Sequence, residues 1–158
     1  MRRRLKFMAI KARYVHTNLT CRDWKRLVRF YCNVFGCVPT GPDRDYTGDW
    51  LDRLTSLRSA HLRGIHLLLP GYEGAGPTLE IFTYDNMAAR NAPAVNEPGF
   101  GHIAFAVDDV DEVLAAVITA GGSTVGDVVV TKVKGVGSLR VVYARDPEGN
   151  IVELQKWS

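Results

Sequence analysis

Two histidines and two glutamates occupy positions in this sequence where a metal ion could be bound. His16 and His102 each open a strand-like run, and Glu80 and Glu153 each lie between two aliphatic residues of a later run. Side chains alternate between the two faces of a strand, so each glutamate points away from its aliphatic neighbours. Imidazole nitrogen and carboxylate oxygen together suit zinc, nickel, manganese, cobalt or ferrous iron. The sequence therefore predicts one divalent ion, whose charge would offset the cost of burying the carboxylates.

The residues that must position these side chains form an internal repeat. Three landmarks coincide when the sequence is shifted by 86 residues: His16 with His102, Asp23 with Asp109, and Gly36 with Gly122. After each aspartate, apolar residues recur at the spacing of an amphipathic helix, which predicts helices over 24–35 and 110–118. Asp109 with Glu112 has the spacing of a capping box, and a glycine follows each helix as a stop.

Each predicted helix is followed by three strand-like runs separated by turn residues. The runs cover residues 37–40, 62–69 and 78–83 in the first half and 125–133, 139–144 and 151–155 in the second. Both halves therefore have the order β-α-β-β-β, which predicts an α+β fold of two tandem βαβββ modules around a metal site. A short helix over residues 49–55 is predicted to cover the mouth of a cavity.

These elements divide the chain into a tail and one domain. Residues 1–12 form a basic N-terminal tail, and residues 13–158 form a single domain. Its modules span residues 13–85 and 99–158, and a proline-containing linker of residues 86–98 joins them.

Composition indicates an ordinary globular protein. The chain has 158 residues, of which 46% are hydrophobic and 23% are charged. No apolar run approaches the roughly 18 residues of a membrane span, and the basic start lacks the apolar segment of a secretory signal. The three cysteines form no evident disulfide framework. A cytoplasmic protein that binds neither membrane nor nucleic acid is therefore expected, although the basic tail raises the net charge to +3.

Longer motifs resemble those of the vicinal oxygen chelate superfamily, which includes glyoxalase I, methylmalonyl-CoA epimerase, fosfomycin and bleomycin resistance proteins and extradiol dioxygenases. The resemblance extends from about His16 to Trp157. It is carried by Phe30-Tyr-Cys-Asn-Val-Phe-Gly36, Thr78-Leu-Glu-Ile-Phe82, Gly99-Phe-Gly-His-Ile-Ala-Phe-Ala-Val-Asp-Asp109 and Asp146-Pro-Glu-Gly-Asn-Ile-Val-Glu-Leu154.

The resemblance implies a strongly curved sheet in which paired modules enclose the metal. The positions that match the family's ligands are His16, Glu80, His102 and Glu153. In such proteins the ion chelates two neighbouring oxygens of a substrate and stabilises an enediolate or similar oxyanion. A ligand glutamate then serves as the catalytic base, and Glu80 and Glu153 are both candidates. A lyase or isomerase of the glyoxalase I or epimerase type is the leading hypothesis.

Two other functions fit the same resemblance. Extradiol dioxygenases need two histidines and one glutamate around ferrous iron, together with further catalytic residues for which His66 and Tyr143 are available. A module that binds a drug or metabolite without chemistry is the second alternative, but such relatives generally lack the ligands that this chain retains.

Substrate contacts and assembly are less constrained by the sequence. Asn18, Lys132 and Arg140 lie on strands expected to border the cavity and are candidate substrate-binding residues, and the loop containing Arg44 and Trp50 is a candidate for shaping specificity. Each module supplies half of the ligands, and the linker allows them to meet within one chain or between two. We expect a homodimer, because pairing also covers exposed strand edges.

Overall fold

The computed structural model describes residues 11–158, so most of the predicted basic tail lies outside the described residues. Within this range the chain forms nine strands and three helices. In chain order they are β1 (His16–Thr20), α1 (Trp24–Phe35), β2 (Val38–Tyr46), α2 (Asp49–Thr55), β3 (Leu62–Leu68), β4 (Thr78–Tyr84), β5 (His102–Ala106), α3 (Val110–Thr119), β6 (Ser123–Thr124), β7 (Val129–Val133), β8 (Gly137–Arg145) and β9 (Ile151–Trp157).

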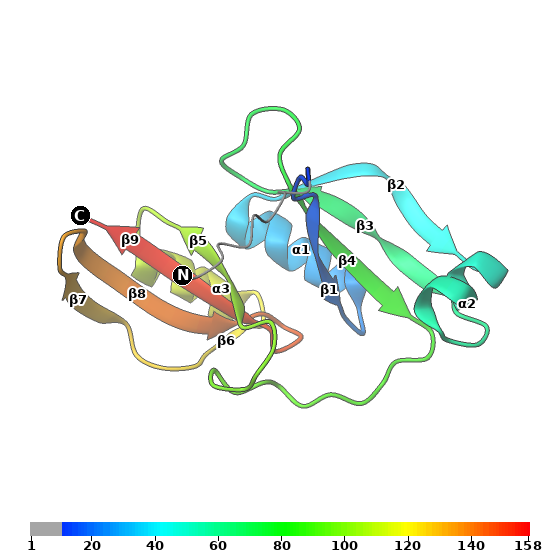
Figure 1. Ribbon diagram of the computed structural model, residues 1–158. Coiled ribbons are helices and arrows are strands. Elements are labelled where there is room, and N and C mark those ends of the chain that lie inside the picture. The colour runs from blue at the N-terminus through cyan, green and yellow to red at the C-terminus, as the bar shows by residue number, and fades with distance from the viewer. Residues whose placement is uncertain (1–10) are drawn as a thin grey trace, which may run out of the picture.

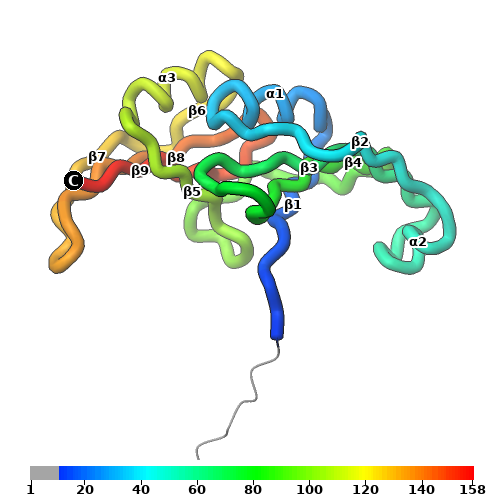
Figure 2. Tube along the Cα trace, turned by 90° about the horizontal axis from the view of Figure 1, so that it is seen from above, coloured from blue at the N-terminus to red at the C-terminus, as the bar shows by residue number. Residues whose placement is uncertain are grey.

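Each module forms its own curved sheet, and the two sheets lie side by side (Figure 1). The first has the strand order β1-β4-β3-β2, and the second has the order β5-β9-β8-β6, with β7 also paired to β8. In each sheet the first strand runs parallel to the last, and the other pairs are antiparallel. Helices α1 and α3 contact each other and cover the same face of both sheets (Figure 2). The predicted α+β class and the two βαβββ modules are confirmed.

Both long helices begin at the predicted residues, and α1 ends before Gly36 as predicted, whereas α3 continues one residue further than predicted, to Thr119. The Asp23 side chain accepts a hydrogen bond from the Arg26 amide, and the Asp109 side chain accepts from the amides of residues 111 and 112. These caps satisfy amides that have no partner within the helix. Gly36 ends α1 in the left-handed region, at a φ of 69°, where glycine carries no steric penalty.

The core is formed by the strand side chains that face the helices, as side-chain alternation along the strands predicts. Leu19, Leu79 and Ile81 of the first sheet are buried beneath α1, and Leu154 takes the corresponding place in the second sheet. The ring of Phe105 stacks on that of Phe35, with centroids 4.1 Å apart, and so joins the two modules. The opposite face of each sheet, which carries the histidines and glutamates, is therefore left for function.

A buried polar cluster also joins the modules. Asp146, in the turn between β8 and β9, accepts a 3.0 Å hydrogen bond from the Tyr31 hydroxyl of α1 and another from the Asn150 side chain. Burial raises the pKa of Asp146, and burial together with the Asp146 carboxylate raises the pKa of Tyr31 well above its usual value. Glu148 of the same turn accepts from the Arg22 backbone amide just before α1. The turn of the second module is thereby attached to the helix of the first.

Replacing Tyr31 by phenylalanine should lower the free energy of unfolding by about 1–3 kcal/mol, because the buried Asp146 loses a hydrogen-bond donor. Urea unfolding at neutral pH measures this change. Tyr72→Phe is the matched control, since Tyr72 is exposed. Equal stability of the two variants would show that the Tyr31–Asp146 bond contributes nothing to the joining of the modules.

Three elements differ from the sequence prediction or refine it. The strand predicted over 125–133 begins only at Val129, as β7, and Gly126 lies in the irregular segment that separates it from the short β6. The strand predicted over 37–40 continues to Tyr46 through a bulge at residues 41–43. The short helix predicted over 49–55 is present as α2. No helix in residues 11–158 is long and apolar enough to cross a membrane.

Candidate metal centre and adjoining pocket

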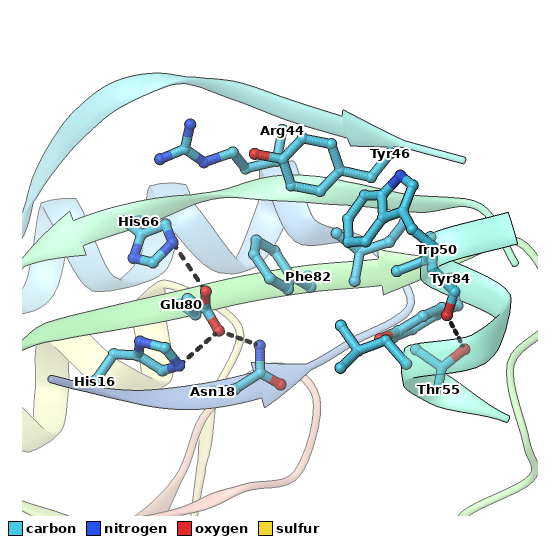
Figure 3. Close-up of a pocket in the computed structure, with 13 residues that line it drawn as sticks. His16, Asn18, Arg44, Tyr46, Trp50, Thr55, His66, Glu80, Phe82 and Tyr84 are labelled. Atoms are coloured by element: carbon cyan, nitrogen blue, oxygen red, sulfur yellow. Dashed lines mark hydrogen bonds and ion pairs between the residues drawn. The ribbon is translucent and has the colours of Figure 1, made fainter. Parts of the chain in front are cut away.

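Three neighbouring strands bring His16, His66 and Glu80 together on the helix-free face of the first sheet. Glu80 lies in β4 directly opposite His66 of β3 and opposite Asn18 of β1. Cross-strand partners share a face, so the side chains on both sides of Glu80 point the same way. Figure 3 shows the two imidazoles and the Asn18 amide directed at the Glu80 carboxylate.

The Glu80 carboxylate is the centre of this cluster. Its Oε2 lies 3.2 Å from Nε2 of His16 and accepts a 3.3 Å bond from Nδ2 of Asn18. Its Oε1 lies 2.8 Å from Nε2 of His66. The Glu80 side chain is only 13% exposed. A carboxylate this enclosed requires hydrogen-bond donors or a cation to stabilise its charge.

His66 is neutral in the arrangement that its neighbours favour. Its Nδ1 lies 3.0 Å from the Thr78 hydroxyl, and its Nε2 faces Glu80. A carboxylate only accepts, so we assign the ring proton to Nε2, and the Thr78 hydroxyl donates to Nδ1. Burial lowers the pKa of His66, and the positive charge of Arg44 lowers it further, while Glu80 raises it. His66 therefore lies against the Glu80 carboxylate and restricts its position through this contact.

The second module repeats the pair. Nε2 of His102 in β5 lies 3.1 Å from Oε2 of Glu153 in β9. Tyr143 of β8 is directly opposite Glu153, the place that His66 holds opposite Glu80, and its ring lies 5.0 Å from that of His102. Burial and the charge of Glu153 raise the pKa of Tyr143. Each module thus presents a histidine–glutamate pair with a third ring beside it.

The donor set fits a divalent transition metal. Ligand atoms of His16, His66 and Glu80 all lie within 4.8 Å of one another. Within residues 11–158 this is the one group of three or more such residues, so His102 and Glu153 do not join it in a single chain. The four residues predicted as ligands therefore appear as two separate pairs.

A pocket with a volume of about 510 Å³ opens beside the first pair. Its polar end is formed by His16, Asn18, His66 and Glu80, and Arg44 of β2 lies above them (Figure 3). The rest of its wall is mainly apolar and includes residues of α2. The predicted position of α2 at the mouth of a cavity agrees with this lining.

Lys132 and Arg140, which sequence reasoning assigned to substrate binding, lie on the other face of their sheet. Tyr143 and Glu153 share the functional face, so residue 140, three positions before Tyr143, has the opposite orientation. Arg140 instead donates a 3.0 Å bond from Nε to Asp111 at the start of α3. Lys132 pairs with Ser138 and shares the face of Arg140. Neither residue is included in the site that we propose.

His66 is the residue of this cluster that the sequence analysis leaves outside the predicted ligand set. Strand alternation indicates its orientation: His66 lies between the buried Ile65 and Leu67, so its side chain faces away from the core. Its distance from Glu80 along the chain hid the contact, which depends on the register of β3 against β4.

Comparisons with known proteins agree with the observed fold. The family model described as "Glyoxalase/Bleomycin resistance protein/Dioxygenase superfamily" matches residues 13–154. A protein of Vibrio parahaemolyticus described as "Probable lactoylglutathione lyase" is 27% identical over 146 residues, which cover 90% of this chain and 88% of that protein.

Solved structures show the same fold. A glyoxalase family protein from Bacillus cereus superimposes with a TM-score of 0.79 at 20% identity, and the match covers 95% of this chain and 97% of that one. A genomically encoded fosfomycin resistance protein from Listeria monocytogenes gives a TM-score of 0.58 at 19% identity, with 95% and 96% covered.

Proposed function

This chain belongs to the Glyoxalase/Bleomycin resistance protein/Dioxygenase superfamily, and on that premise we propose that it is a metal-dependent lyase or isomerase of the glyoxalase I or epimerase type. The observation that carries the proposal is the convergence of His16, His66 and Glu80 on one end of a small-molecule pocket. The similarity to a protein described as a lactoylglutathione lyase supports the same class of reaction.

We propose that His16, Glu80, His102 and Glu153 hold one divalent ion. When bound, the ion would supply Lewis-acid stabilisation of negative charge on a substrate oxygen. The chain itself must move a proton to and from the carbon beside the carbonyl, and a carboxylate of Glu80 or Glu153 serves as that base. Asn18 donates a hydrogen bond to Glu80, and His66 lies against the same carboxylate, so the two residues hold it in place.

We further propose that a homodimer completes the site. His102 and Glu153 do not join the cluster of His16 and Glu80 in one chain. Strands β1 and β5 each lie at the edge of their sheet. Pairing β1 of one copy with β5 of another would cover both edges and place the two histidine–glutamate pairs face to face.

A specific observation supports an extradiol dioxygenase as the second candidate. His16, His66 and Glu80 are two histidines and one carboxylate within a single module, the set typical of non-haem ferrous oxygenases. Oxygen consumption by the iron-loaded protein with a catechol separates the candidates. Uptake dependent on the catechol supports the dioxygenase, whereas proton exchange without oxygen uptake supports the isomerase.

The purified protein should contain about one divalent ion per chain. We expect His16→Ala and His102→Ala each to reduce the bound metal strongly, because each removes a proposed ligand. His61→Ala is the control, since His61 bonds to Asp45 and Asp85 outside the pocket. Elemental analysis after dialysis provides the measurement. Full metal content in His102→Ala, with loss in His66→Ala, would assign the ion to the first module alone.

A further inference from the structure

The pocket beside Glu80 has two chemically different ends. Beyond the histidines, its wall consists of aromatic and aliphatic side chains that reach from β2, α2, β3 and β4. They include Tyr46, Trp50, Leu54, Phe82 and Tyr84. Figure 3 shows the rings of Tyr46, Phe82 and Trp50 grouped at the side of the pocket away from His16. Its volume of about 510 Å³ is in the range of small-molecule sites, roughly 300–1,000 Å³.

Helix α2 presents apolar side chains to this pocket although they are accessible to solvent. Leu51 is 2% exposed and anchors the helix in a small core with Leu62 and Phe82. By contrast, Trp50 is 53% exposed and Leu54 is 74% exposed. Leu51 packs the helix into this core, whereas two large apolar residues beside the cavity stay exposed. Such exposed apolar surface at a pocket is typical of a ligand contact.

The ring of Phe82 fits against β3 because residue 64 has no side chain. Gly64 of β3 is directly opposite Phe82. A Cβ atom at residue 64 would lie 2.4 Å from the Phe82 ring and 2.0 Å from the Ile81 carbonyl oxygen. Glycine at this position therefore lets the aromatic ring lie across the strand and form part of the pocket wall.

Trp50 and Tyr46 meet edge to face, with ring centroids 5.4 Å apart and planes at 72°. The ring of Phe82 is itself edge-on to His66, at 6.0 Å. Aromatic groups favour edge-to-face and offset-stacked partners, so these rings favour a further planar ring packed against them in the pocket.

Arg44 supplies a positive charge at the boundary between the two ends. A bulge in β2 before Arg44 shifts the pairing with β3, and Arg44 then lies opposite Gly64 on the functional face. Within residues 11–158 no carboxylate lies within 4.0 Å of the Arg44 guanidinium. A guanidinium without an acidic partner beside a ligand pocket is suited to bind a carboxylate through two hydrogen bonds.

We propose that the pocket selects an aromatic carboxylic acid with an oxygen on the carbon next to the carboxylate. Arg44 binds the carboxylate, and Trp50, Tyr46 and Phe82 hold the ring. The assignment of the oxygen-bearing carbon to the end near Glu80 rests on the proposed function. A glutathione adduct fits this wall less well, because its charged tripeptide would meet the aromatic end.

Isothermal titration of the full chain, with and without bound zinc, tests the proposal through three related probes. Phenyllactate has the ring, the carboxylate and the neighbouring oxygen, whereas lactate lacks the ring and phenylpropanediol lacks the charge. We expect phenyllactate to bind roughly 10- to 100-fold more tightly than either truncated probe. Similar affinities for phenyllactate and lactate, or tighter binding of S-methylglutathione than of phenyllactate, would overturn the proposal. These comparisons use the unaltered protein, so no variant has to fold.

Two variants then assign the groups. Trp50→Ala should weaken phenyllactate by roughly 10-fold and leave lactate unchanged. Arg44→Met should weaken both acids and leave phenylpropanediol unchanged. Trp157→Ala and Arg53→Met are the matched controls, because both residues are exposed and lie outside the pocket lining. The assigned contacts would be contradicted if Trp50→Ala weakened lactate as much as phenyllactate, or if Arg44→Met weakened phenylpropanediol as much as the two acids.

The result is separable from the proposed function. If the zinc-free protein binds phenyllactate more tightly than lactate and phenylpropanediol, the pocket proposal is supported even when no metal-dependent turnover is found. Conversely, metal binding with turnover of a substrate that lacks a ring would retain the proposed function and exclude the aromatic acid.

Discussion

Glu80→Gln and Glu153→Gln should each lower turnover of an identified substrate by roughly two to four orders of magnitude. The amide of glutamine cannot accept a proton at physiological pH, and it is a weaker metal ligand than a carboxylate. For Glu80 the change also alters the contacts that His16, His66 and Asn18 make with its two oxygens. Steady-state kinetics with metal in excess measures the loss in kcat.

Circular dichroism and thermal unfolding should show that both variants keep the fold, because the functional face contributes little to the core. Glu73→Gln, in an exposed loop, is the matched control and should retain full activity. Near-native kcat in both Glu80→Gln and Glu153→Gln would exclude a glutamate base. A large loss in one variant alone would identify which of the two carboxylates carries the proton.

Mixing the two inactive variants should restore activity if the site is shared between copies. A dimer of Glu80→Gln with Glu153→Gln pairs the intact first module of one chain with the intact second module of the other. Random pairing at equal concentrations then gives about a quarter of the wild-type activity. The refolded mixture is assayed beside each variant alone.

The control for this experiment is a chain that carries both substitutions, mixed with either single variant. Every dimer in that mixture lacks an intact pair of modules, so no activity should return. A failure of the first mixture to recover activity, with exchange of subunits verified by native mass spectrometry, would place the complete site within one chain.

Much of the fold follows from short-range patterns. The spacing of apolar residues predicts α1 and α3, and Asp23, Gly36 and Asp109 mark their ends through capping that depends on a few neighbouring residues. The repeat then predicts two βαβββ modules. The prediction placed the start of β7 at residue 125 instead of Val129 and did not include β6, because strand pairing rather than local propensity decides where an irregular run joins a sheet.

For the site, strand alternation alone places His16, Glu80, His102 and Glu153 on the face away from the helices, since the side-chain period of a strand is two. The sequence by itself therefore determined the module repeat, the helix boundaries and the orientation of the four candidate ligands. It did not determine which of these residues meet. Those contacts depend on the hydrogen-bond register between strands that are far apart in the chain. A shift of one residue in this register moves every side chain of a strand to the opposite face of the sheet.

The tertiary structure therefore decided which of the candidate residues come into contact. The register of β3 against β4 places His66 beside Glu80, and the register of β8 against β9 turns Arg140 toward α3. The bulge in β2 and the anchoring of α2 by Leu51 create the pocket that Arg44 borders. None of these contacts has a local signature, because each joins residues that only the folded sheet brings into contact.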